Sequence, residues 1–156
     1  MNITAADVNK LRQMTGAGMM DCKKALTEAN GDFDGAIDLL RKKGQKVAAN
    51  RGDREASEGL VIAKSVDGGK RGVMIVLNCE TDFVAKNADF GVVANHILDI
   101  AIENKPSNLD ELKALNYTGT ELTINDKIVE EIGKIGEKIE LSHYSVVNAE
   151  QVFAYN

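Results

Sequence analysis

The spacing of apolar residues changes from a helical to an extended period near residue 58, and this change limits the possible folds more than any other feature of the sequence. Before it, apolar residues recur every three or four positions in three short stretches, as in amphipathic helices. After it, two apolar runs, 60–66 and 73–78, flank a glycine-rich turn at 67–70, which is typical of an antiparallel hairpin. The pattern therefore predicts an α+β protein, in which a small helical bundle precedes a core with an antiparallel sheet and packed helices.

Residues 1–50 are predicted to form a three-helix domain. Thr4, followed by Asp7, is typical of a helix start with an acid in the first turn, and the break at 15–18 separates this helix from a second. Asp32 is placed to begin a third helix, which we expect to end at Gly44. A bundle of this length has a limited core and is marginally stable alone.

The rest of the chain divides into a linker at 51–57, a core subdomain at 58–142 and the start of an incomplete second core subdomain at 143–156. Helical spacing over 88–103 is followed by two further helices, and alternation of apolar and polar residues then predicts a strand over 139–147. Another strand is predicted to begin at 152–155. An unpartnered apolar edge is an aggregation hazard, so we expect the chain to be a fragment of a longer protein.

Composition argues against several classes of partner. With 19 basic and 24 acidic residues the formal net charge is −5, which disfavours a protein that binds along a nucleic-acid backbone. The basic stretch 41–54 indicates a helical or flexible linker with solvated charges. A contact with nucleic acid or an acidic partner is a minor alternative. Neither a membrane span nor a signal peptide is recognisable, and Cys22 and Cys79 lie within apolar patterns. We therefore expect a cytoplasmic protein with two buried, reduced thiols.

Motifs for enzymatic or metal chemistry fail at their decisive positions. The acidic cluster at 30–35 imitates the start of a calcium loop, but Arg41 stands where the bidentate glutamate is required. His96 and His143 lie in different predicted elements with no further ligand at zinc spacing, so both are interpreted as structural or surface histidines. Because no nucleophile or carboxylate pair stands out either, we expect no enzyme activity, no cofactor and no metal.

The stretch Thr-Asp-Phe-Val-Ala-Lys at 81–86 is the strongest candidate site. It places an acid beside an aromatic residue between a predicted buried strand and a predicted helix, which is a rigid place to display side chains. Thr81 or Asp82 is suited to cap the start of that helix. A purely structural interpretation stays open at this point, in which Phe83 fills a core and Asp82 only caps.

Two strings of the sequence, Thr-Gly-Ala-Gly-Met-Met-Asp-Cys-Lys-Lys-Ala-Leu at 15–26 and the stretch at 81–86, resemble the signature motifs of the bacterial translation elongation factor Ts family. The resemblance implies a three-helix N-terminal domain similar to ubiquitin-associated domains. It also implies a non-enzymatic guanine-nucleotide exchange factor that binds elongation factor Tu in its GDP-bound and nucleotide-free states. The family's dimerisation insert has no counterpart here, so a monomer is expected. We expect no membrane and no direct nucleic-acid partner.

The same resemblance implies which residues contact the partner. They are Arg12, Met19, Met20, Thr81, Asp82, Phe83, Val84 and Lys86. Phe83 would act as a wedge and Asp82 as a competing carboxylate at the magnesium and phosphate site of the GTPase, while Lys86 would help to dock the loop. As alternatives, Met19 and Met20 belong to the bundle core and Arg12 is merely solvated. Two other functions stay open: a truncated module that binds elongation factor Tu without efficient exchange, and a ubiquitin-type or RNA-binding adaptor that uses the basic stretch.

Overall fold

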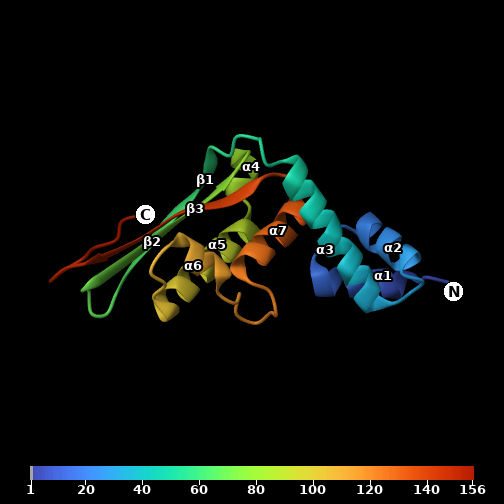
Figure 1. The fold of residues 1–156 in the computed structure, drawn as a ribbon, viewed down its shortest axis with the longest axis horizontal. Coiled ribbons are helices and arrows are strands. Elements are labelled where there is room, and N and C mark those ends of the chain that lie inside the picture. Colours follow the sequence, from blue (N-terminus) through green and yellow to red (C-terminus); the bar gives the residue numbers. More distant parts are fainter. Residues whose placement is uncertain (1) are drawn as a thin grey trace. The chain divides into compact units, whose positions relative to one another are not determined.

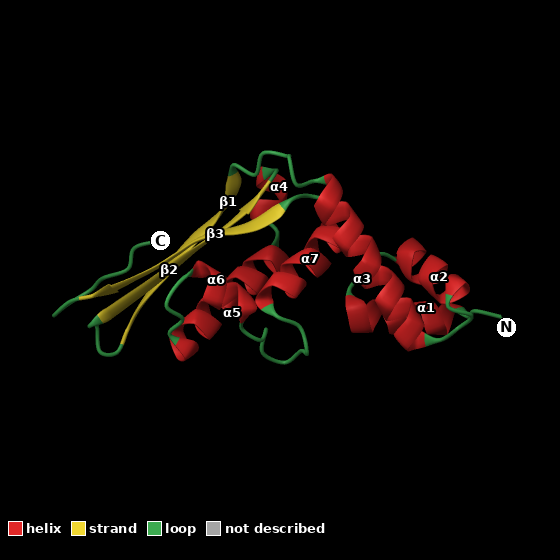
Figure 2. Cartoon of the chain, in the orientation of Figure 1, coloured by secondary structure: helices red, strands yellow, loops and turns green. Residues whose placement is uncertain are grey.

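The computed structural model describes residues 2–156 and shows helices together with one antiparallel sheet (Figures 1 and 2). The elements are α1 (Ala5–Thr15), α2 (Met19–Glu28), α3 (Phe33–Asn50), β1 (Glu58–Val66), β2 (Arg71–Cys79), α4 (Asp82–Ala85), α5 (Ala88–Asn104), α6 (Leu109–Ala114), α7 (Ile124–Ile135) and β3 (Ile139–Asn148). The predicted α+β class with an N-terminal three-helix bundle is confirmed.

The chain forms two compact units, each of which is described by itself. The helical unit comprises Met1–Asp53 and Val129–Glu137, and the sheet unit comprises Arg54–Ile128 and Lys138–Asn156. The division of the chain proposed above, with boundaries after residues 50, 57 and 142, stays a prediction. None of the helices in residues 2–156 has the length and apolar character needed to cross a membrane.

The helical unit begins with a capping box. The Thr4 side chain accepts a hydrogen bond from the Asp7 N–H, and the Asp7 carboxylate accepts one from the Thr4 N–H (2.9 Å) and one from its hydroxyl (2.7 Å). These bonds, with the hydroxyl contributing most, lower the pKa of Asp7 below its ordinary value. At the other end of α1, Gly16 adopts the left-handed conformation, and this ends the helix as the sequence predicted. The core between α1, α2 and α3 consists of Val8, Leu11, Cys22, Ala25, Leu26 and Ala36.

The predicted end of the third helix at Gly44 is wrong, because α3 continues through this residue to Asn50. Gly44 is buried and packs against α7 instead of capping α3. A Cβ atom added to Gly133 would lie 2.5 Å from the Cα of Gly44, and one added to Gly44 would lie 2.9 Å from the carbonyl oxygen of Val129. The two glycines thus allow a backbone contact that no larger residue permits, and this packing outweighs their low helix propensity.

We predict that Gly133→Ala destabilises the protein by about 1–3 kcal/mol, because the added methyl group forces α3 and α7 apart. Gly91→Ala is the matched control, since Gly91 also lies inside a helix, α5, and a Cβ added there meets no atom within 4 Å. The control should be neutral or stabilising by up to about 1 kcal/mol. Urea unfolding of both variants measures the difference, and equal stabilities would contradict the close-packing role of Gly133.

The sheet unit is built around β2, the central strand in the order β1-β2-β3. The predicted hairpin of β1 and β2 is confirmed, with Glu58 opposite Cys79 at one end and Val66 opposite Arg71 at the other. β3, which confirms the strand predicted over 139–147, pairs with the other side of β2. Alternate residues of β2, from Arg71 to Cys79, are buried, and α5 packs against β1 and β2. This packing gives the sheet one helix-covered face.

The strand predicted over 152–155 is wrong, because residues 151–156 form no strand. The segment instead turns back beside the β1–β2 hairpin (Figure 1). The Val152 N–H donates to the carbonyl oxygen of Gly69 (2.6 Å), and the side-chain amide of Asn156 bonds both backbone groups of Ala63 on β1 (3.0 Å each). Isolated bonds, two of which involve the Asn156 side chain, replace the regular backbone ladder that a strand requires.

Candidate functional site

The stretch at 81–86 forms one helical turn, α4, held between β2 and α5. Thr81 has an extended backbone, and its hydroxyl accepts a hydrogen bond from the Val84 N–H (3.4 Å), so Thr81, and not Asp82, caps this helix. On the β2 side, the buried thiol of Cys79 donates to the carbonyl oxygen of Thr81 (3.2 Å). On the α5 side, Asn87 caps the next helix by accepting from the N–H groups of Asp89 and Phe90. Both ends of the turn are therefore anchored.

Phe83 projects from this turn into solvent, with 83% of its surface exposed. The interpretation in which it fills a core is therefore wrong. Phe90, seven residues later on α5, is only 2% exposed and shows what a core phenylalanine of this unit looks like. Exposing an aromatic ring of this size forgoes a hydrophobic contribution of about 1.5–3 kcal/mol. A large apolar side chain displayed on an anchored turn is available to fill a pocket of a binding partner.

The residues beside Phe83 in the α4 turn differ in their exposure to solvent. Asp82 and Lys86 are exposed and form an ion pair one helical turn apart, with 3.1 Å between the Lys86 Nζ and the Asp82 Oδ2. With this exposure to solvent the pair contributes little to stability. Thr81 and Val84 are half-buried and face the body of the unit more closely. The turn consequently presents an acid, an aromatic ring and a base to the outside.

Met19 and Met20, at the start of α2, are also exposed, at 56% and 75%. The interpretation in which they form the bundle core is therefore wrong. Arg12, on α1, is exposed as well. The two methionines line an apolar groove of about 450 Å³ together with Ile3 and Val8. Thioether side chains adapt readily to different binding surfaces, so this groove suits an apolar group of a partner.

Sequence reasoning missed the contribution of Ile3 and Val8 to this groove. A signal for it is present, because Ile3 precedes the N-cap residue Thr4 and Val8 follows it by four positions, the spacing of a hydrophobic staple. Arg12, Met19 and Met20 belong to the helical unit, whereas residues 81–86 belong to the sheet unit. The predicted site residues thus form two groups, one in each unit, and within the first group Met19 and Met20 line the groove whereas Arg12 does not.

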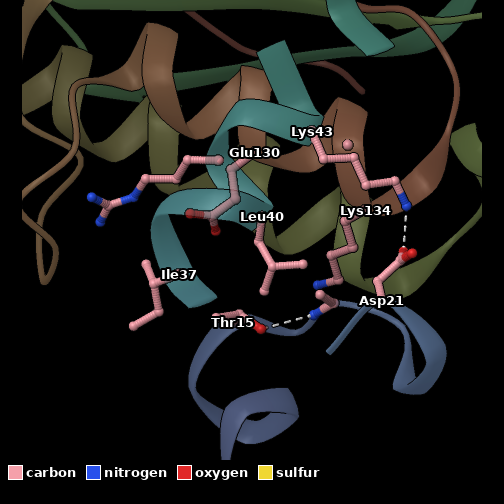
Figure 3. A pocket seen from close by; sticks show the side chains of 10 residues that line it. Thr15, Asp21, Ile37, Leu40, Lys43, Glu130 and Lys134 are labelled. Atoms are coloured by element: carbon pink, nitrogen blue, oxygen red, sulfur yellow. Dashed lines mark hydrogen bonds and ion pairs between the residues drawn. The ribbon is translucent and has the colours of Figure 1, made fainter. Parts of the chain in front are cut away.

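A separate small cavity in the helical unit has the character of a structural void (Figure 3). It measures about 40 Å³, which is enough for roughly one water molecule. Lys43 forms an ion pair with Asp21 at its edge, and the Thr15 hydroxyl accepts a hydrogen bond from the Ala17 N–H (3.3 Å). Since these polar groups bind one another, the cavity does not resemble a ligand site.

The thiols and imidazoles have structural surroundings. Cys22 and Cys79 are both buried and free, as predicted, and burial raises the pKa of the Cys22 thiol. His96 stacks on Tyr117, with 4.3 Å between ring centroids, and its Nε2 lies 3.1 Å from the Thr118 carbonyl oxygen. His143 is exposed. Residues 2–156 contain no group of three or more metal-binding side chains.

Comparison with known proteins assigns the chain to a family. Residues 80–156 match the family model described as Elongation factor TS. Proteins named Elongation factor Ts from Amoebophilus asiaticus and Christiangramia forsetii are 54% and 58% identical to the chain over 99% and 98% of its length. The protein of that name from Bacteroides thetaiotaomicron is 53% identical over all of it.

These matches relate the chain to proteins named as elongation factors. It belongs to the elongation factor Ts family, as the two signature strings indicated. The chain spans about half the length of the curated relatives it matches, since it covers 55%, 54% and 46% of the three proteins.

Because Phe83 is exposed, its removal is expected to have little effect on the free energy of unfolding. Phe83→Ala should change the free energy of unfolding by less than about 0.5 kcal/mol, because the ring has few contacts to lose. Phe90→Ala, which removes the same atoms from a buried position, should cost about 3–5 kcal/mol. Urea unfolding of the two variants tests this. A large loss of stability in Phe83→Ala would show that the ring is packed in solution.

Proposed function

We propose that this chain binds elongation factor Tu and promotes the release of GDP from it by inserting the α4 turn near the magnesium and phosphate site of the GTPase. The observation that carries the proposal is the 83% exposure of Phe83 on a turn anchored at both ends. Membership of the elongation factor Ts family supports the choice of partner. The setting we propose is the cytoplasm, where the free thiols remain reduced.

Differential binding is sufficient for this activity. A factor that binds the nucleotide-free GTPase more tightly than the GDP-bound form must weaken GDP binding by the same factor. Burial of the Phe83 ring in an apolar gap of the partner would contribute about 1.5–3 kcal/mol. This energy corresponds to a factor of roughly 10 to 150 in affinity. No covalent bond changes, so the proposed activity requires no nucleophile and no general acid or base.

Asp82 would act on the nucleotide site electrostatically. Its carboxylate lies next to Phe83 and is held only by the exposed ion pair with Lys86, which contact with a partner can replace at little cost. A carboxylate brought close to a bound magnesium ion competes with the phosphate oxygens that hold it, and repels the phosphates themselves. Lys86, released from the pair, would then be available to dock the turn on the partner.

The groove on the helical unit would supply a second contact. Met19 and Met20 border it, and Arg12 is exposed on α1 of the same unit. Binding through this groove and through α4 at the same time would raise the effective concentration of the Phe83 turn at the nucleotide site. The groove therefore accounts for affinity and α4 for exchange.

We expect Phe83→Ala to slow GDP release from elongation factor Tu by roughly 10- to 100-fold at a saturating concentration of the chain. Stopped-flow measurement with a fluorescent GDP analogue gives the rate. Val92→Ala is the matched control, because Val92 is also apolar and is 64% exposed on α5, outside the proposed site. An unchanged rate in Phe83→Ala would eliminate the proposed role of the ring.

Calorimetry distinguishes exchange from binding alone. If the unmodified chain binds elongation factor Tu tightly but leaves its affinity for GDP unchanged, the chain is a binding module and the exchange function is refuted. Met20→Ala should weaken the binding step, and its effect on GDP release should disappear at saturating concentration, as expected for a contact that contributes only to affinity.

A further inference from the structure

Glu80 links three segments of the sheet unit immediately before the α4 turn. Its side chain is only 13% exposed. One carboxylate oxygen accepts a hydrogen bond from the backbone N–H of Lys138 (3.3 Å), and the other lies 3.9 Å from the Nε of Arg54. The Lys138 Nζ in turn donates to the carbonyl oxygen of Arg54 (3.2 Å). The start of the sheet unit, the end of β2 and the residue before β3 therefore meet at this carboxylate.

The position of Glu80 in the sheet explains why a carboxylate is needed there. The ladder between β2 and β3 ends at the pair of Cys79 and Ile139. Beyond this pair the chain leaves β2 to form α4. The Glu80 side chain accepts a hydrogen bond from the next N–H of the β3 side, that of Lys138. A side chain thus extends the sheet by one bond while the backbone turns away.

We propose that Glu80 is a positioning residue, which fixes the direction in which the α4 turn presents Phe83 and Asp82. This inference rests on the proposed exchange function of that turn. The cap formed by Thr81 is long, at 3.4 Å, and does not by itself define the orientation of the helix. A turn that is already oriented loses less conformational entropy on binding. Loss of the Glu80 contacts should therefore weaken the binding of the α4 turn to the partner, although it removes no group that touches the partner.

The first test measures order in the free chain and does not depend on exchange. Nitrogen-15 relaxation should give lower backbone order parameters for residues 82–86 in Glu80→Ala than in the unmodified chain. Glu80→Gln, which keeps an oxygen that can accept from the Lys138 N–H, should largely restore them. Glu140→Ala is the control, because Glu140 is an exposed carboxylate on β3, opposite Asn78. Unchanged order parameters in Glu80→Ala, or no restoration by Gln, would overturn the inference.

The second test is a double-mutant cycle on GDP release from elongation factor Tu. Glu80→Ala should slow release on the order of tenfold, the scale of one hydrogen bond to a charged group. In a Phe83→Ala background the same change should slow release less than about threefold, because the apolar group that Glu80 positions is gone and only the electrostatic contribution of Asp82 remains. Urea unfolding of each variant shows that the chains compared are folded.

The outcomes separate the two proposals. Equal slowing by Glu80→Ala in both backgrounds would mean that Glu80 does not act through Phe83 and would overturn the positioning role alone. If Phe83→Ala releases GDP at the normal rate, the proposed function fails and the exchange role of Glu80 fails with it. The order parameters identify this second case, because they change in Glu80→Ala whether or not the turn drives exchange.

Discussion

Burial of the central strand β2 against α5 is the contact on which the rest of the sheet unit depends. Val73, Ile75, Leu77 and Cys79 are at most 1% exposed on its covered face, and both edges of the strand are paired. A strand held in this way has a fixed end, since any shift in register would turn its apolar residues toward solvent. The α4 turn begins three residues beyond Cys79, so the position of the candidate site follows from the position of the core.

The contrast between Phe83 and Phe90 shows how closely spaced residues of one type take opposite roles. Thr81 caps the start of α4 and Asn87 caps the start of α5, so the two helices are separate and the chain changes direction between them. The second phenylalanine is carried into the core, while the first is left on the outside of a single turn. The unit thus gives up hydrophobic stabilisation at one position and leaves a preformed apolar surface exposed there, an exchange of stability for function that the proposed binding role would explain.

Close backbone packing plays the corresponding role in the helical unit. Gly44 and Gly133 allow α3 and α7 to approach without intervening side chains. In an isolated peptide each glycine would weaken its helix by about 1 kcal/mol. In the folded unit the contact between them outweighs this cost, which is why a glycine that is typical of a helix end lies well inside α3. Local propensity and tertiary packing disagree here, and packing prevails.

The sequence alone was enough to predict the α+β class, the three N-terminal helices, the hairpin of β1 and β2, and β3, because these follow from periodicity and from caps such as Thr4 and Asp32 that act over a few residues. It also marked residues 81–86 as the candidate site and, through two motifs, the family. Three further features became visible only in the folded chain, because they depend on contacts between distant segments. These are the passage of α3 through Gly44, the course of residues 151–156 beside β1, and the outward orientation of Met19, Met20 and Phe83. An apolar residue fits a core and a binding surface equally well in the sequence, and only the neighbours brought by folding distinguish the two.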